Sequence, residues 1–132
     1  MIEPLPPRLR ARLNANYLLQ MTLGRFDHLV DLYPFVRISL TGTPGFWLLS
    51  EADPGDPDFF FGLSAKDHRP QLGWLRLTGM ERYAQSRGLG LERDLTFAPT
   101  MSLGAYLEQA RSGDQALGPG QARRPSSSPS LR

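Results

Sequence analysis

The chain has 132 residues, the length of one ordinary domain, and its hydrophobic content of 40% supports a packed core. The absence of cysteine excludes disulfides, thiolate metal sites and a cysteine nucleophile. The formal net charge of +2 comes from the segment after residue 112, where three arginines face one aspartate, so residues 1–112 are neutral overall. Charge therefore gives no support to a nucleic-acid-binding domain, which carries a concentrated basic face.

The N-terminal residues lack an export signal, because Pro6, Pro7 and Arg8 interrupt any apolar segment there. No apolar run approaches the roughly 20 residues that are needed to span a bilayer. Together with the lack of cysteine, these features predict a soluble protein of the cytoplasm.

A helix is predicted over about residues 6–22, ending near Gly24. Two prolines at positions 6 and 7 suit a first helical turn, where a missing N–H donor costs little. Apolar side chains then recur at steps of three and four residues and form one stripe: Leu9, Leu13, Tyr17, Leu18 and Met21.

Four short strands are predicted in the middle of the chain, at residues 36–41, 46–49, 59–63 and 72–77. The turn-forming segment 41–45 joins the first two strands, so these two form a hairpin. A loop rich in turn formers, 53–58, precedes the third strand. The connections are too short for crossover helices, which favours an antiparallel meander.

Two shorter helices and a fifth strand are predicted in the C-terminal part. A helix of about ten residues begins with a capping box of Thr78 and Glu81 and ends before Gly88. Residues 91–97 alternate as a strand, and Ser102 opens the last helix.

These elements predict one α+β domain over residues 1–111. It consists of a mainly antiparallel five-stranded sheet, packed by an N-terminal helix and two short C-terminal helices. From residue 112 the composition changes to Gly, Pro, Ser, Gln and Arg, which cannot bury enough apolar surface to offset the entropy of ordering. Residues 112–132 are therefore expected to form a disordered tail.

The strongest candidate for chemistry is an acidic cluster after the second strand, formed by Glu51, Asp53, Asp56 and Asp58. Carboxylates at spacings of two or three residues can bind Mg²⁺ or Ca²⁺. The cluster lacks the pattern of a calcium-binding loop, and Asp beside Pro and Gly is typical of turns in which the side chain bonds loop N–H groups. Turn chemistry is the favoured interpretation, and a metal site is the alternative.

Glu92, Arg93 and Asp94 on the fifth strand form the second candidate. Alternation places the two carboxylates on one face and Arg93 on the other, with the apolar Leu95. An arginine on an apolar face needs a carboxylate or several carbonyls as partners, because an unpaired buried charge is costly. Glu51 or an aspartate of the acidic loop could supply the carboxylate. A structural ion pair is favoured over an anion-binding site.

The aromatic residues of the strands, Trp47, Trp74, Phe59 and Phe61, could form a stacking platform for single-stranded nucleic acid. Such a platform needs exposed aromatic side chains interleaved with basic ones, and these strands carry few cations. Aromatic side chains on short strands belong more often to the core, which is the favoured interpretation. The sequence contains no phosphate-binding glycine loop, nucleophile elbow or metalloprotease motif.

Residues 8–111 resemble, in order and spacing, a bacterial family of domains of unknown function that is met on conjugative plasmids and other mobile elements. The resemblance is carried by RARLNAN at 10–16, PFVRI at 34–38, WLLSE at 47–51, DPGDPD at 53–58, FGL at 61–63, QLGW at 71–74 and GLGLERDL at 88–95 with Phe97. The chain departs from the family where Gln71 replaces a usual Glu and Gly90 a usual Pro.

The resemblance implies an accessory role on mobile DNA, including antagonism of host restriction or CRISPR defences. We expect a non-catalytic binding or inhibitory module that meets a protein partner through the acidic loop and needs no cofactor or metal. One alternative is a metal-dependent hydrolase or nuclease using Glu51, Asp53 and Asp58, with Glu92 and Asp94 nearby. The other is a binder of single-stranded nucleic acid, which overall charge does not support.

Overall fold

The computed structural model describes residues 4–24 and 30–116 and shows an α+β fold, as predicted. All strands belong to one antiparallel sheet with the order β4-β3-β2-β1-β5. The elements are α1 (Pro7–Gly24), β1 (Val36–Leu40), β2 (Phe46–Ala52), β3 (Phe59–Ala65), β4 (Gln71–Arg76), α2 (Leu77–Ser86), β5 (Leu91–Arg93) and α3 (Leu103–Ala116). The first four strands form the predicted meander, and β5 joins the far edge beside β1.

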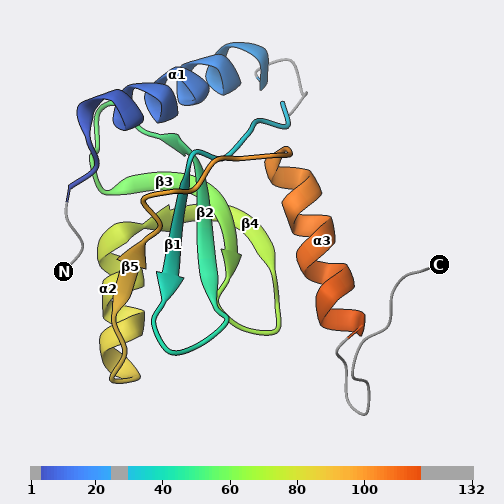
Figure 1. The fold of residues 1–132 in the computed structure, drawn as a ribbon. Coiled ribbons are helices and arrows are strands. Elements are labelled where there is room, and N and C mark those ends of the chain that lie inside the picture. The colour runs from blue at the N-terminus through green and yellow to red at the C-terminus, as the bar shows by residue number, and fades with distance from the viewer. Residues whose placement is uncertain (1–3, 25–29, 117–132) are drawn as a thin grey trace.

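The three helices lie on different sides of the sheet (Figure 1). Helix α1 runs across one end of the strands, and α2 and α3 cover opposite faces of the sheet. Successive residues of a strand point to opposite faces, so neighbouring strand residues pack against different helices. Trp47 packs with Met80 of α2, whereas its neighbour Leu48 packs with Leu103 and Leu107 of α3. None of the helices in the described ranges is long and apolar enough to cross a membrane.

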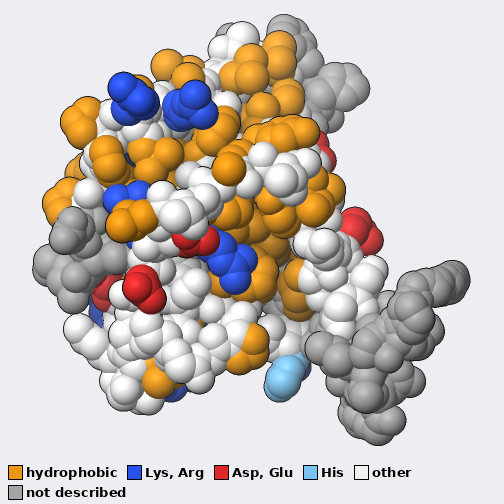
Figure 2. Space-filling model, in the orientation of Figure 1, with side chains coloured by type: hydrophobic (Ala, Val, Ile, Leu, Met, Phe, Trp, Pro, Cys, Tyr) orange, Lys and Arg blue, Asp and Glu red, His pale blue; other side chains and the backbone are white. Residues whose placement is uncertain are grey.

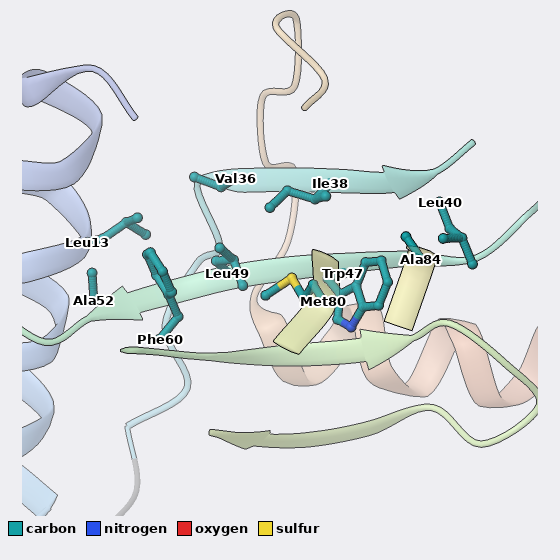
Figure 3. Close-up of a cluster of buried hydrophobic side chains, with 10 residues drawn as sticks. All are labelled: Leu13, Val36, Ile38, Leu40, Trp47, Leu49, Ala52, Phe60, Met80 and Ala84. Atoms are coloured by element: carbon teal, nitrogen blue, oxygen red, sulfur yellow. The ribbon is translucent and has the colours of Figure 1, made fainter. Parts of the chain in front are cut away.

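The larger core lies between the sheet, α1 and α2 (Figure 3). It contains ten buried side chains: Leu13, Val36, Ile38, Leu40, Trp47, Leu49, Ala52, Phe60, Met80 and Ala84. The predicted apolar stripe of α1 reaches this core only in part. Leu13 is fully buried, whereas Leu18 and Met21 are more than half exposed, because the helix passes beyond the end of the sheet.

The predicted start of α2 is wrong. Arg76 is the residue before the helix and has no side-chain capping bond, and Thr78 lies inside the first turn. The cap comes instead from Asp58, which accepts hydrogen bonds from the Thr78 N–H and hydroxyl at 2.9 and 2.7 Å. The predicted end is confirmed: Gly88 has a φ of 68°, and its N–H donates to the Gln85 carbonyl.

Helix α3 begins as predicted but continues past the expected boundary. The Ser102 hydroxyl accepts a bond from the Ala105 N–H at 3.3 Å, as a helix cap does. The helix extends to Ala116, so the start of the predicted tail at residue 112 is helical. The rest of the predicted tail, residues 117–132, lies outside the described residues.

Candidate functional site

The aspartates of the acidic loop organise the loop itself. Asp53 Oδ1 accepts the Gly55 N–H at 2.8 Å, and Asp56 Oδ1 accepts the Asp58 N–H at 3.1 Å. These are side-chain-to-backbone turns of the kind that Asp favours. The hydrogen bonds therefore support the turn interpretation of this segment.

The loop is also tied to the end of β4. Arg76 Nη1 lies 3.0 Å from Asp56 Oδ2 and 3.8 Å from Asp58 Oδ2, and its guanidinium sits over the Phe59 ring. The Asp58 N–H and then Arg76 lower the pKa of Asp56 below its ordinary value. These ion pairs are largely solvent-exposed and contribute little stability, but they place one arginine beside two of the loop's aspartates.

The carboxylates do not converge on a metal position. Within residues 4–24 and 30–116, no three His, Asp or Glu side chains are placed to hold one ion. Asp58 is committed to capping α2, and Glu51 takes a different direction from the loop aspartates. The arrangement required by a metal-dependent hydrolase is therefore not formed by these residues.

A β-bulge sets the direction of Glu51. In the pairing of β2 with β3, Leu49 lies opposite Gly62 and Glu51 opposite Phe61, so Ser50 is an extra residue. Strict alternation from Leu49 would place Glu51 in the core under α2. The bulge instead brings it beside Phe61 on the face that α3 covers, which is a common use of bulges.

On this face Glu51 lies in a hollow of about 400 Å³ between α1, the sheet and the start of α3, here called the Glu51 hollow. Its lining is mostly apolar, and Leu72 and Trp74 at its rim are 39% and 48% exposed. The lining residues are Gln20, Val30, Asp31, Leu32, Ser50, Glu51, Phe61, Leu72, Trp74, Leu103 and Gly104.

Glu51 is buried but weakly bonded. Its side chain belongs to a residue only 3% exposed, and among the described residues its one hydrogen bond comes from Gln20 Nε2 at 3.5 Å. Gln20 is held in place because its amide makes two bonds of 2.7 Å to the Val30 backbone. Burial raises the pKa of Glu51 to about 7, and the Gln20 bond offsets only part of this increase.

Asp31 fixes the opposite wall of the Glu51 hollow. Its Oδ2 accepts the Ser102 hydroxyl at 2.6 Å and its Oδ1 accepts the Gly104 N–H at 2.8 Å, while Leu103 N–H donates to the Leu32 carbonyl. The negative charge of a carboxylate at this position also interacts favourably with the positive N-terminal end of the α3 helix dipole. Both Asp31 oxygens are thus used to hold the first turn of α3.

The family model described as a protein of unknown function (DUF2958) matches residues 5–117. The chain belongs to this family. No curated protein and no solved structure matches the chain significantly. The predicted membership in a family of unknown function is confirmed, and the association with mobile elements stays a prediction. The match spans the described helices and strands of the DUF2958 domain and the described residues that line the Glu51 hollow.

The two tryptophans of the DUF2958 domain have different environments, and the favoured core interpretation holds for Trp47 but not for Trp74. Trp47 is 2% exposed and packs edge-on against Tyr83 in the core under α2. Trp74 is half exposed at the hollow rim, stacked on Phe59 with ring centroids 4.9 Å apart, and Phe61 meets it edge-on. Trp74 is therefore the accessible member of the set.

The end of β5 and the turn that follows it also differ from the prediction for residues 91–97. The strand ends at Arg93, and Asp94 begins a turn by accepting the Thr96 N–H and hydroxyl, which lower its pKa. Leu95 is 78% exposed and does not continue the apolar face. Arg93 forms no ion pair with any described residue, and Glu51 bonds to Gln20 instead. Glu92, Arg93 and Asp94 line a separate, polar depression.

Proposed function

We propose that this DUF2958 domain is a non-catalytic binding module that holds a side chain of a protein partner in the Glu51 hollow. The observation that carries the proposal is a buried carboxyl with one long hydrogen bond at the base of an open, apolar hollow. Binding sites combine apolar walls with a few polar groups that fix orientation, and the hollow has this composition. We therefore propose the Glu51 hollow as the contact surface, in place of the acidic loop that the sequence predicted.

A catalytic role for the hollow has less support. A carboxyl with a pKa near 7 is suited to proton transfer, but a reaction needs further groups in reach. Ser50 donates its hydroxyl to the Phe61 carbonyl, and both Asp31 oxygens bond to α3. The lining residues within 4–24 and 30–116 include no His, Lys or Arg. Glu51 is therefore better supported as a recognition group than as a general base.

A nucleic-acid partner has less support for a different reason. Phosphate backbones are bound through clusters of Lys and Arg. On the face shown in Figure 2, the basic side chains are scattered among acidic and hydrophobic ones, and hydrophobic side chains reach the surface over α1 and toward α3. A protein surface with apolar anchors is a better match to this face.

The proposal is tested by selecting random peptides displayed on phage against the full chain. We expect enriched peptides that bind the wild type, lose binding with Trp74→Ala and keep it with Leu95→Ala. Leu95 is a matched control because it is the more exposed apolar side chain and lies outside the hollow. Failure to enrich any peptide, or equal binding to both variants, would contradict the proposal.

We place this binding module on mobile DNA as an accessory protein that antagonises host restriction or CRISPR defence. The support is the sequence resemblance described above, together with a binding surface that needs no catalytic machinery. Deleting the gene from a donor element should lower transfer into a host with active defences but not into a host without them. Equal transfer into both hosts would argue against this setting.

A further inference from the structure

Among the residues that the structure describes, those lining the Glu51 hollow carry charge of one sign. Glu51 and Asp31 are the ionisable ones, and the described lining side chains from α1, β3, β4 and α3 carry no charge. Asp31 has both oxygens bonded to the first turn of α3, whereas Glu51 keeps most of its hydrogen-bonding capacity. A ligand that completes the site must therefore bring hydrogen-bond donors and positive charge to Glu51.

The geometry distinguishes between the two long cationic side chains. A guanidinium has five N–H donors in a planar fork, and a single carboxylate would leave several of them unbonded in an apolar hollow. An ammonium has three donors, which the two Glu51 oxygens and the neighbouring Ser50 hydroxyl can accept. The acceptors at the base of the hollow thus suit an ammonium.

The walls suit an alkyl chain behind that ammonium. Phe61, Leu72, Trp74 and Leu103 line the same hollow as Glu51, and a volume of about 400 Å³ admits one extended side chain. Lysine buries its methylene groups against apolar surface while its charged head finds a polar partner.

From these features we infer that the partner's anchor in the Glu51 hollow is a lysine, whose ammonium pairs with the Glu51 carboxylate. The inference rests on the proposed function and names its ligand. Folding has already removed the Glu51 carboxylate from water, so binding does not add this desolvation cost. An entering ammonium therefore meets a negative charge that is already held in place.

The pairing makes binding depend on pH. Because the pKa of Glu51 is about 7, its ionised fraction rises about tenfold between pH 6 and pH 8, while an alkylammonium stays charged. The other carboxyl among the described lining residues is Asp31, and both of its oxygens are bonded to the first turn of α3. Amine affinity should therefore rise about tenfold over this range.

The test uses n-butylamine, which has the chain and head of lysine, and n-butanol, which lacks the charge. Binding to the full chain is followed by the indole N–H signals in ¹H–¹⁵N spectra, where Trp74 reports on the hollow and the buried Trp47 serves as internal reference. At pH 8 butylamine should bind at least about tenfold more tightly than butanol. Glu51→Gln should remove this preference, and Glu92→Gln, which removes an exposed carboxylate elsewhere, should keep it.

Equal affinity for the two probes, a preference that survives Glu51→Gln, or no Trp74 shift with either probe would overturn the lysine inference. The selected peptides separate this failure from failure of the proposed function. Peptides that need Trp74 but bind Glu51→Gln and the wild type with equal affinity would support the binding module and exclude lysine as its anchor. Peptides that share a lysine and lose at least about tenfold in affinity with Glu51→Gln would support both.

Discussion

Replacing Glu51 by glutamine should stabilise the protein above neutral pH. The pKa of Glu51 rises from its ordinary value of 4.5 to about 7 in the folded domain because the carboxyl is buried. Between these two values the folded protein holds a proton that the unfolded chain has released. The contribution of Glu51 to the free energy of unfolding is thus highest below pH 4.5, where Glu51 is protonated in both states. It falls as the pH rises through about 7, where Glu51 ionises in the folded protein.

The size of the effect follows from the two pKa values. The difference between 4.5 and about 7 corresponds to about 3 kcal/mol, at ~1.36 kcal/mol for each pKa unit. The Glu51 hollow is open to water, which screens part of this cost, so we expect about 2 kcal/mol. Glutamine keeps the shape of the side chain and has no charge to desolvate.

Urea unfolding of wild type and Glu51→Gln at pH 4.5 and pH 8 measures this difference. The variant should gain about 2 kcal/mol relative to the wild type between the two pH values. Glu92→Gln is the control, because it removes an exposed carboxylate and should show no comparable gain. A constant difference between Glu51→Gln and wild type at both pH values would refute the reasoning, since it would mean that Glu51 titrates alike in the folded and unfolded states.

Two further substitutions test the supports of the fold. Asp58→Ala removes the cap of α2 and should cost about 1–2 kcal/mol in urea unfolding; an unchanged midpoint would show that the cap is dispensable. Gly62→Ala drives a Cβ into the Leu48 carbonyl oxygen, so β2 and β3 must separate, and it should cost more than about 2 kcal/mol. Its control, Gly73→Ala, meets nothing within 4 Å and should stay within about 0.5 kcal/mol; equal losses would contradict this account.

The sequence was sufficient for features that depend on local pattern. The first four strands follow from apolar alternation and turn-forming residues, and Gly88 and Ser102 mark helix ends because their roles involve neighbours in the chain. The α2 cap could not be predicted in the same way. Asp58 is twenty positions before Thr78, and only the pairing of β3 with β4 brings the two together.

The candidate site was predictable only in its parts. Glu51 and Trp74 were identified from residue type, but no signal in the sequence shows the extra residue at Ser50 that turns Glu51 toward Trp74. Gln20 and Asp31 were missed because an amide on a helix and an aspartate in a connection have many ordinary roles. A carboxylate that directly continues an apolar strand was the one weak signal of a buried acid.

The cost of Glu51 argues for a role in binding. Among the described residues the carboxyl contributes one hydrogen bond of 3.5 Å, and Gln20 would keep its two bonds to Val30 without it. An expected loss of about 2 kcal/mol, set against one long hydrogen bond, is of the kind found at sites that trade stability for function. The bulge at Ser50 also supports a role in binding. Strict pairing there would have placed Glu51 in the core under α2, and the bulge turns it into the hollow instead. The ammonium that we propose as the partner would turn this destabilising buried acid into a specific contact.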